Sequence, residues 1–216
     1  LVQISPFCIA CVLVAGLSGA SFLTLGPIYA KSLGLSLPEI SFFMASFIVG
    51  CALIPLFTGW LSDRIERRRV IIAVTIFGFC VSVLAYSFTS LLIVASFFFG
   101  GCVASIYSIS AAHMNDRLKP SQITSATASL ILVNGISSCI APIVLAVLLD
   151  FYGADIFFIF LSVAFVLLSV FGVYREIVGE TITVDDQNEF QAMPPVRTSP
   201  AVVLLTHPEE GEEESA

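Results

Sequence analysis

Four arginines lie within six residues, from Arg64 to Arg69, in a chain that has only nine Lys and Arg residues in all. The segment reads Asp63-Arg64-Ile65-Glu66-Arg67-Arg68-Arg69 and directly follows an apolar stretch. Cationic residues near a membrane surface bind anionic headgroups, and each contributes about 1 kcal/mol there. Water or the charges of a partner can solvate Asp63 and Arg64 at this position. The segment therefore predicts a charged loop that contacts headgroups or a partner.

Two other residue pairs have spacings that are typical of reactive sites. Cys8 and Cys11 have the spacing of a redox or metal-binding pair, but no His or acid neighbours them, and all six cysteines lie in apolar segments. We interpret the cysteines as packing residues. His113 lies close to Asp116, and we interpret it as a hydrogen-bonded residue at the membrane interface rather than as a proton relay.

The apolar segments lack the residue sets that catalysis needs. They contain no serine–histidine pair, no carboxylate pair and no His/Glu metal cluster. We therefore expect no enzyme, no metal site and no cofactor. No Asp, Glu, Lys or Arg falls deep in these segments either. Since charges at membrane depth usually mark ion pathways, the chain offers no obvious proton carrier.

Small polar residues are concentrated in the first, fourth and fifth apolar segments, whereas the third and sixth are mostly Val, Ile, Phe and Leu. Asn134 and Tyr107 have the larger polar groups, which need a partner when they are buried. The alternative is that such residues only hold helices together, because small and polar side chains also mediate helix packing in membranes. The predicted candidates for a substrate path are Asn134, Tyr107, Ser105, Ser21 and Thr24.

The overall composition excludes a water-soluble domain. Apolar residues make up 57% of the chain, charged residues make up 12%, and the mean hydropathy is +1.00. A soluble domain has about 25% charged residues, so we exclude a globular enzyme in solution, a nucleic-acid-binding protein and a disordered regulator. Residues 1–175 contain eight basic and six acidic residues, whereas residues 176–216 contain one Arg and ten acids. The sequence therefore predicts a membrane-embedded domain in residues 1–175 and an acidic tail in residues 176–216.

The lengths of the uncharged segments predict how often the chain crosses the membrane. A helix needs about 20 apolar residues to cross a hydrocarbon core of about 30 Å. The uncharged stretch 70–115 has 46 residues, too many for a single crossing, so it must turn back at the polar residues 87–90. Continuous apolar runs favour helices over a β-barrel. The sequence predicts an all-α membrane protein with six transmembrane helices, at about residues 4–30, 40–61, 70–87, 91–114, 122–149 and 156–174.

The distribution of Lys and Arg predicts the orientation of these spans. Short loops that are rich in Lys and Arg stay in the cytoplasm. Seven of the eight basic residues in 1–175 follow the second, fourth or sixth span, and Lys31 is the exception. Both ends of the chain are therefore expected in the cytoplasm. Residues 176–216 have too little apolar content for a core, and we expect a disordered cytoplasmic tail that either makes a regulatory contact or only aids solubility.

The charged segment and the residues before it match a known signature. Residues 59–69 resemble the Gly-x-Leu-x-Asp-Arg-x-Gly-Arg-Arg signature of the major facilitator superfamily (MFS), which joins the second and third helices of each six-helix half. The second glycine of the signature is Glu66 here. A weaker match, residues 111–118, is similar to the YcaD-like group of uncharacterised bacterial MFS transporters. The residues that match the signature are Gly59, Leu61, Asp63, Arg64, Arg67 and Arg68.

The resemblance implies a fold and a role for the motif. Residues 1–175 would form helices seven to twelve of an MFS transporter, the C-terminal of its two six-helix halves, and the start at Leu1 fits a segment of a longer protein. In this family the first and fourth helices of each half face the central cavity, and the third and sixth face lipid. The acid of the motif pairs with arginine and a helix end across the two halves in the outward-facing state. The alternative is that the motif charges only determine topology.

We therefore expect secondary active transport of a small solute by alternating access across the bacterial inner (plasma) membrane. The expected partners are the N-terminal six-helix half of the same transporter, a small-molecule substrate and the lipid bilayer, but no nucleic acid. The alternative hypothesis is a non-transporting receptor, assembly subunit or scaffold that uses the same fold. The polar residues favour transport, because a scaffold would not need them gathered on three helices while two others stay apolar.

Overall fold

The structure is a computed structural model that describes residues 6–116 and 120–178 of the chain. The loop residues Arg117 and Lys119, and the predicted tail from residue 179 onward, lie outside the described residues. The regular secondary structure of the described part is helical, without strands. It comprises α1 (Pro6–Ser32), α2 (Leu37–Ser62), α3 (Arg67–Ser87), the 3₁₀-helix η1 (Thr89–Leu91), α4 (Leu92–Asn115), α5 (Pro120–Tyr152) and α6 (Ile156–Val178).

Six of these helices are long and apolar enough to cross a membrane. Even α3, with 21 residues, spans about 31 Å at 1.5 Å per residue, which matches the hydrocarbon core. The prediction of an all-α protein with six membrane-length helices is thereby confirmed.

The helix ends differ by a few residues from the predicted spans. The largest difference is at the end of α6, which lies at Val178 rather than at 174. Helix α3 begins at Arg67, so three of the motif arginines lie in the first turn of a helix. The backbone N–H groups of Arg69 and Val70 donate to the carbonyl oxygen of Glu66 at 2.9 and 3.2 Å. Glu66 has a φ of −50°, which any L-residue can adopt, so this turn does not need the glycine of the family signature.

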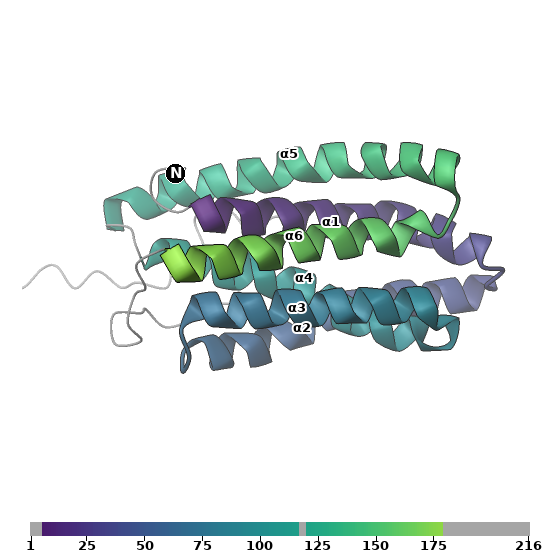
Figure 1. The fold of residues 1–216 in the computed structure, drawn as a ribbon, viewed down its shortest axis with the longest axis horizontal. Helices are drawn as coiled ribbons and strands as arrows, with labels where there is room; N and C mark the ends of the chain where they lie inside the picture. Colours follow the sequence, from purple (N-terminus) through teal and green to yellow (C-terminus); the bar gives the residue numbers. More distant parts are fainter. Residues whose placement is uncertain (1–5, 117–119, 179–216) are drawn as a thin grey trace, which may run out of the picture.

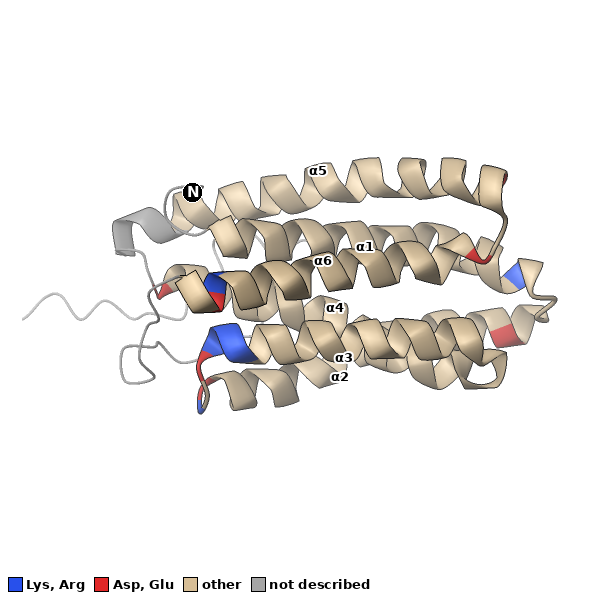
Figure 2. Ribbon diagram, viewed as in Figure 1, with Lys and Arg blue, Asp and Glu red and all other residues tan. Residues whose placement is uncertain are grey.

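The six helices lie side by side along the long axis of the molecule (Figure 1). The most extensive contacts join α2 with α4, α1 with α5, and α3 with α6. In the described part, charged residues lie near the two ends of the bundle and are absent between them (Figure 2). We call the end with residues 63–66 the motif end and the end with residues 33–36, 88–91 and 153–155 the turn end. Gly34 and Gly153 in these turns have a φ of 79°, which favours glycine.

Helices α2 and α4 approach each other closely, because a glycine of each helix faces the backbone of the other. A Cβ atom on Gly50 would come within 1.8 Å of the Phe97 carbonyl oxygen, and one on Gly100 within 2.2 Å of the Phe47 carbonyl oxygen. The thiol of Cys51 donates to the carbonyl oxygen of Gly100 at 3.2 Å. Small residues allow this approach, which is how helices associate in a medium as apolar as their own side chains.

The centre of the bundle is filled by aromatic rings, and its outer faces are also apolar. The ring of Phe22 lies 4.2 Å from that of Phe47 and 5.7 Å from that of Phe99, measured between centroids. On the outside, Phe42 and Phe57 are 66% and 65% exposed. Large apolar side chains on the surface of a six-helix bundle are expected where lipid or a further helical domain covers them.

Candidate functional site

Asp63, Arg67 and Asp116 form a charged cluster where three helices end. Asp63 caps the C-terminal end of α2, Arg67 is the first residue of α3, and Asp116 caps the C-terminal end of α4. The Nε atom of Arg67 lies 2.9 Å from Oδ2 of Asp116, and its Nη2 atom lies 3.6 Å from Oδ1 of Asp63. The side chains of Arg67 and Asp116 are 0% and 1% exposed, whereas that of Asp63 is 32% exposed. One arginine therefore joins the ends of α2 and α4 to the start of α3.

All three charges of this cluster lie at helix ends that disfavour them individually. Helix N-termini carry partial positive charge and C-termini carry partial negative charge. Arg67 at the start of α3 and Asp116 at the end of α4 therefore each need an opposite charge. Removing one partner of a buried ion pair typically costs about 3–5 kcal/mol. Arg67 and Asp116 thus depend on each other, and the half-exposed Asp63 depends less on the pair.

Two further arginines join the start of α3 to the end of α6. Arg68 is 1% exposed and donates from Nη1 to the carbonyl oxygen of Arg175 at 3.0 Å. The Nε atom of Arg69 lies 3.0 Å from Oε1 of Glu176 and 3.2 Å from Oε2 of Glu66. A cation beside the carbonyl groups at a helix C-terminus is favourable. These contacts therefore join α2, α3, α4 and α6 at the motif end. Figure 2 shows the charged residues gathered at this end of the bundle.

The remaining motif residues shape the end of α2 or lie at its surface. The carbonyl oxygen of Gly59 accepts a hydrogen bond from the backbone N–H of Asp63 at 3.1 Å. Leu61 is partly buried against the apolar core. The guanidinium of Arg64 lies 3.9 Å above the ring of Trp60, which is 50% exposed. At an exposed site such a cation–π contact contributes about 0.5–1 kcal/mol, so Arg64 is oriented toward the outside of α2.

Asn134 lies in the contact between α1 and α5. Its Nδ2 atom donates to the carbonyl oxygen of Val12, and the hydroxyl of Ser138 donates to the carbonyl oxygen of Gly16, both at 3.3 Å. A Cβ atom on Gly16 would come within 2.3 Å of the Ser137 hydroxyl oxygen, so the two helices approach closely here. These contacts are of the kind that helix packing requires, and the role of Asn134 in a substrate path stays a prediction.

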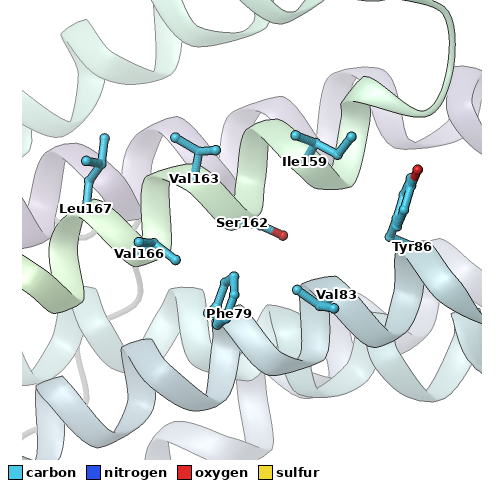
Figure 3. Close-up of a pocket in the computed structure, with 8 residues that line it drawn as sticks. All are labelled: Phe79, Val83, Tyr86, Ile159, Ser162, Val163, Val166 and Leu167. Carbon is cyan, nitrogen blue, oxygen red and sulfur yellow. The ribbon is translucent and has the colours of Figure 1, made fainter.

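The other four candidates for a substrate path have different surroundings. The hydroxyl of Ser105 accepts a hydrogen bond from Thr58 at 2.7 Å, between α4 and α2. Tyr107 and Ser21 are 4% and 0% exposed, and the Ser21 hydroxyl makes no hydrogen bond within the described part of the chain. Thr24 is exposed. A groove between α3 and α6 (Figure 3) is lined by none of the five candidates, so their common role also stays a prediction.

Sequence reasoning missed Asp116 and Glu176 as partners of the motif arginines. A signal for Asp116 was present, because this acid lies two residues after the fourth predicted span and therefore at the motif end of a six-span bundle. Glu176 was missed because the sixth span was expected to end at residue 174, four residues before α6 ends at Val178. His113, one turn before Asp116 in α4, is 4% exposed.

Comparison with known proteins gives one family match and one curated relative. The Major Facilitator Superfamily model matches residues 8–206. The relative, described as the uncharacterised MFS-type transporter YfkF of Bacillus subtilis strain 168, is 29% identical over 96 residues. That alignment covers 44% of this chain and 25% of YfkF.

Two solved structures have a similar fold. The POT family transporter PepTSo superposes with a TM-score of 0.71 and 17% identity, over 99% of this chain and 44% of PepTSo. An auto-inhibited POT family peptide transporter superposes with a TM-score of 0.67 and 18% identity, over 96% of this chain and 42% of that protein. At these identities the likeness concerns the fold alone, and the chain spans less than half the length of either transporter. Since the family match covers nearly all of the six-helix bundle, the chain is a multi-pass membrane protein of the major facilitator superfamily.

Proposed function

We propose that this chain forms one half of a secondary transporter that moves a small solute by alternating access. Membership of the superfamily supports transport. This chain matches less than half of each solved transporter, which supports a complete transporter with a second half of similar size. The observation that carries the proposal is the charged cluster, in which Arg67 pairs with Asp116 and Asp63 and so joins three helix ends. An ion pair at a helix junction can be made or broken, and so it suits a protein with two discrete arrangements.

The second half, in this proposal, packs on α2 and α5. Within the chain α2 and α5 are the least buried of the six membrane-length helices in the described residues, and α4 is the most buried. Their exposed side chains are large and apolar, for example Leu56 at 60% in α2, and Leu132 and Ile143 at 64% and 66% in α5. We infer that the N-terminal six-helix half covers these two faces and that lipid covers the remaining ones.

The charged cluster divides into a gating residue and two structural residues. Asp63 is the member that an adjoining half can reach, because its side chain is 32% exposed and lies 3.6 Å from Arg67. Arg67 and Asp116 are enclosed and hold the ends of α2, α3 and α4 in position. We assign Asp63 to a contact with the other half that favours the outward-facing state. Gly59, Leu61, Arg64 and Arg68 support the shape of the loop.

The motif end lies in the cytoplasm in this proposal, and the membrane is the bacterial inner (plasma) membrane. Four motif arginines and Arg175 lie at that end, whereas Lys31 is the single Lys or Arg in the described residues near the turn end. Short loops with this bias stay in the cytoplasm. The solute would pass between the halves along α1, α4 and α5, where Asn134, Tyr107, Ser105, Ser21 and Thr24 remain the candidate contacts.

A non-transporting receptor or scaffold with the same fold is the competing hypothesis. A scaffold gains nothing from a buried hydroxyl such as that of Ser21, which makes no hydrogen bond within the described residues. Burying a polar group without a partner is unfavourable, so Ser21 is better explained by a solute or a moving helix that meets it. This observation favours transport.

The test uses the full-length protein that contains this chain, reconstituted in proteoliposomes and incubated with an extract of small metabolites. Mass spectrometry of the vesicle contents should find at least one solute enriched over empty vesicles. The variant Asp116→Asn should abolish this enrichment, while Asp150→Asn, an exposed acid at the turn end, should retain it. Contents equal to those of empty vesicles for the wild-type protein would instead support the scaffold.

A further inference from the structure

An apolar groove opens between α3 and α6 in the half of the bundle near the turn end (Figure 3). Its volume is about 230 Å³. Along α6 it extends from Ile159 to Leu167, about 12 Å at 1.5 Å per residue. Ile159, Val163 and Leu167 are 39%, 51% and 65% exposed, so the groove faces outward from the bundle. Its lining consists of Phe79, Val83, Tyr86, Ile159, Ser162, Val163, Val166 and Leu167.

The groove lies beside close contacts between α3 and α6. A Cβ atom on Gly78 would come within 2.2 Å of the Phe165 ring, and one on Gly172 within 2.9 Å of Ile72. These glycines hold the helices together on the side of the groove nearer the motif end. Toward the turn end, bulkier α3 residues such as Phe79 and Tyr86 face α6 and leave a gap between the two helices (Figure 3).

The chemistry and size of the groove select a hydrocarbon chain as its occupant. The hydroxyl of Ser162 is already satisfied by the carbonyl oxygen of Phe158 at 2.7 Å, and the remaining lining at membrane depth is apolar, so water has too few partners to stay there. Apolar cavities of about 150 Å³ hold benzene, and this groove is larger. It is too small for a helix, which is about 10–12 Å across with its side chains. In a bilayer, the apolar occupant of this shape is an acyl chain.

Polar groups at the open end of the groove fit a headgroup that carries an amine. Tyr86, 48% exposed, has its hydroxyl at the end of the groove near the start of α6 (Figure 3). Asp155 is exposed and directly precedes α6, the helix that forms one wall of the groove. Among the described residues near this end there are three acids, Glu39, Asp150 and Asp155, and one base, Lys31. Acidic surroundings favour an ammonium group over an anionic headgroup.

We propose that the α3–α6 groove is a binding site for an aminophospholipid of the bilayer. One acyl chain lies between Phe79, Val83 and Val163, and the ammonium group of the headgroup contacts the carboxylate of Asp155 beside the Tyr86 hydroxyl. The site is separate from the charged cluster, which lies at the opposite end of the bundle.

The acyl-chain part is tested by photo-cross-linking in the full-length protein. The probe is phosphatidylethanolamine with a diazirine in its acyl chain, in vesicles of phosphatidylethanolamine and phosphatidylglycerol. Cross-links should map to residues 79–86 and 159–167. Val163→Trp, which fills the groove, should lower this cross-linking severalfold, and Val170→Trp, at a 63% exposed position on the same helix outside the groove, should leave it unchanged. Ile159→Trp is the second filling variant, to be used if Val163→Trp does not fold.

The headgroup part is tested by comparing diazirine probes with ethanolamine and glycerol headgroups. The ethanolamine probe should cross-link about two- to fivefold more, the factor expected for one surface ion pair. Asp155→Asn should remove this preference, and Asp150→Asn should not. The proposal would be overturned by equal cross-linking in Val163→Trp and Val170→Trp or by a preference for the glycerol headgroup. A disulfide-linked dimer through a single cysteine at position 163 would also overturn it.

Discussion

The guanidinium of Arg67 and the carboxylate of Asp116 approach to 2.9 Å in the protein interior, although 49 residues separate them in the chain. The pair joins the start of α3 to the end of α4. It gives Arg67, the first arginine of the Arg-Arg pair in the family signature, a defined partner that the signature itself does not contain. The stability of the motif end depends on this contact, and the first prediction follows from it.

Asp116→Asn should lower the stability of the protein markedly. The change removes the carboxylate that lies 2.9 Å from the buried guanidinium of Arg67, while Asp63 stays at 3.6 Å. Losing one member of a buried pair typically costs about 3–5 kcal/mol. Thermal unfolding in detergent, followed by the fluorescence of Trp60, measures the effect. The double variant Arg67→Met/Asp116→Leu removes both charges and should recover much of the loss. A double variant less stable than Asp116→Asn would contradict the pairing.

Gly50→Ala should destabilise the α2–α4 contact, because the new Cβ would come within 1.8 Å of the Phe97 carbonyl oxygen. A backbone atom cannot rotate away as a side chain can, so we expect a loss of at least about 1–3 kcal/mol. Gly135→Ala is the matched control, since a Cβ on Gly135 in α5 has no neighbour within 4 Å. The melting temperature of Gly50→Ala should be lower than that of Gly135→Ala. Equal melting temperatures would mean that α2 and α4 are farther apart than described.

Asn134→Ala separates a packing role from a substrate-path role. The hydrogen bond from Asn134 to the Val12 carbonyl oxygen predicts a small loss of stability, since interhelical hydrogen bonds average about 0.6 kcal/mol in measured cases. A role in the path predicts altered affinity or specificity for the solute with almost unchanged stability. Transport kinetics and thermal unfolding of the same variant distinguish the two. Lower stability with wild-type affinity would remove Asn134 from the candidate site residues.

The orientation of the bundle predicts which loops a membrane-impermeant thiol reagent reaches. In a protein without its native cysteines, single cysteines replacing Leu33 and Tyr152, which are 36% and 71% exposed, should react from outside the cell. A cysteine replacing Ile65, 41% exposed at the motif end, should react from the cytoplasm. Reaction of position 65 from outside would reverse the proposed topology.

The number and type of the helices could be predicted from the sequence, because membrane spans are defined by length and composition. The turn at 87–90 was predictable from its polar residues, and η1 begins within it at Thr89. Partners across the bundle could not be predicted in this way. The contact of Arg67 with Asp116 and that of Arg68 with the Arg175 carbonyl oxygen depend on how helix ends meet in space. The surroundings of Ser105 likewise depend on Thr58 in a different helix.

The central claim is that Asp63 biases a transporter that opens to the two sides of the membrane in turn. It is tested by the reactivity of a single cysteine replacing Thr24, an exposed candidate path residue of α1, in the full-length protein in proteoliposomes. An impermeant maleimide applied from either side should label this position. Asp63→Asn should raise the ratio of cytoplasmic to outside labelling, because it weakens the outward-facing state, while Asp150→Asn should leave the ratio unchanged. Labelling from one side only, with a ratio that Asp63→Asn does not alter, would contradict both alternating access and the gating role of Asp63.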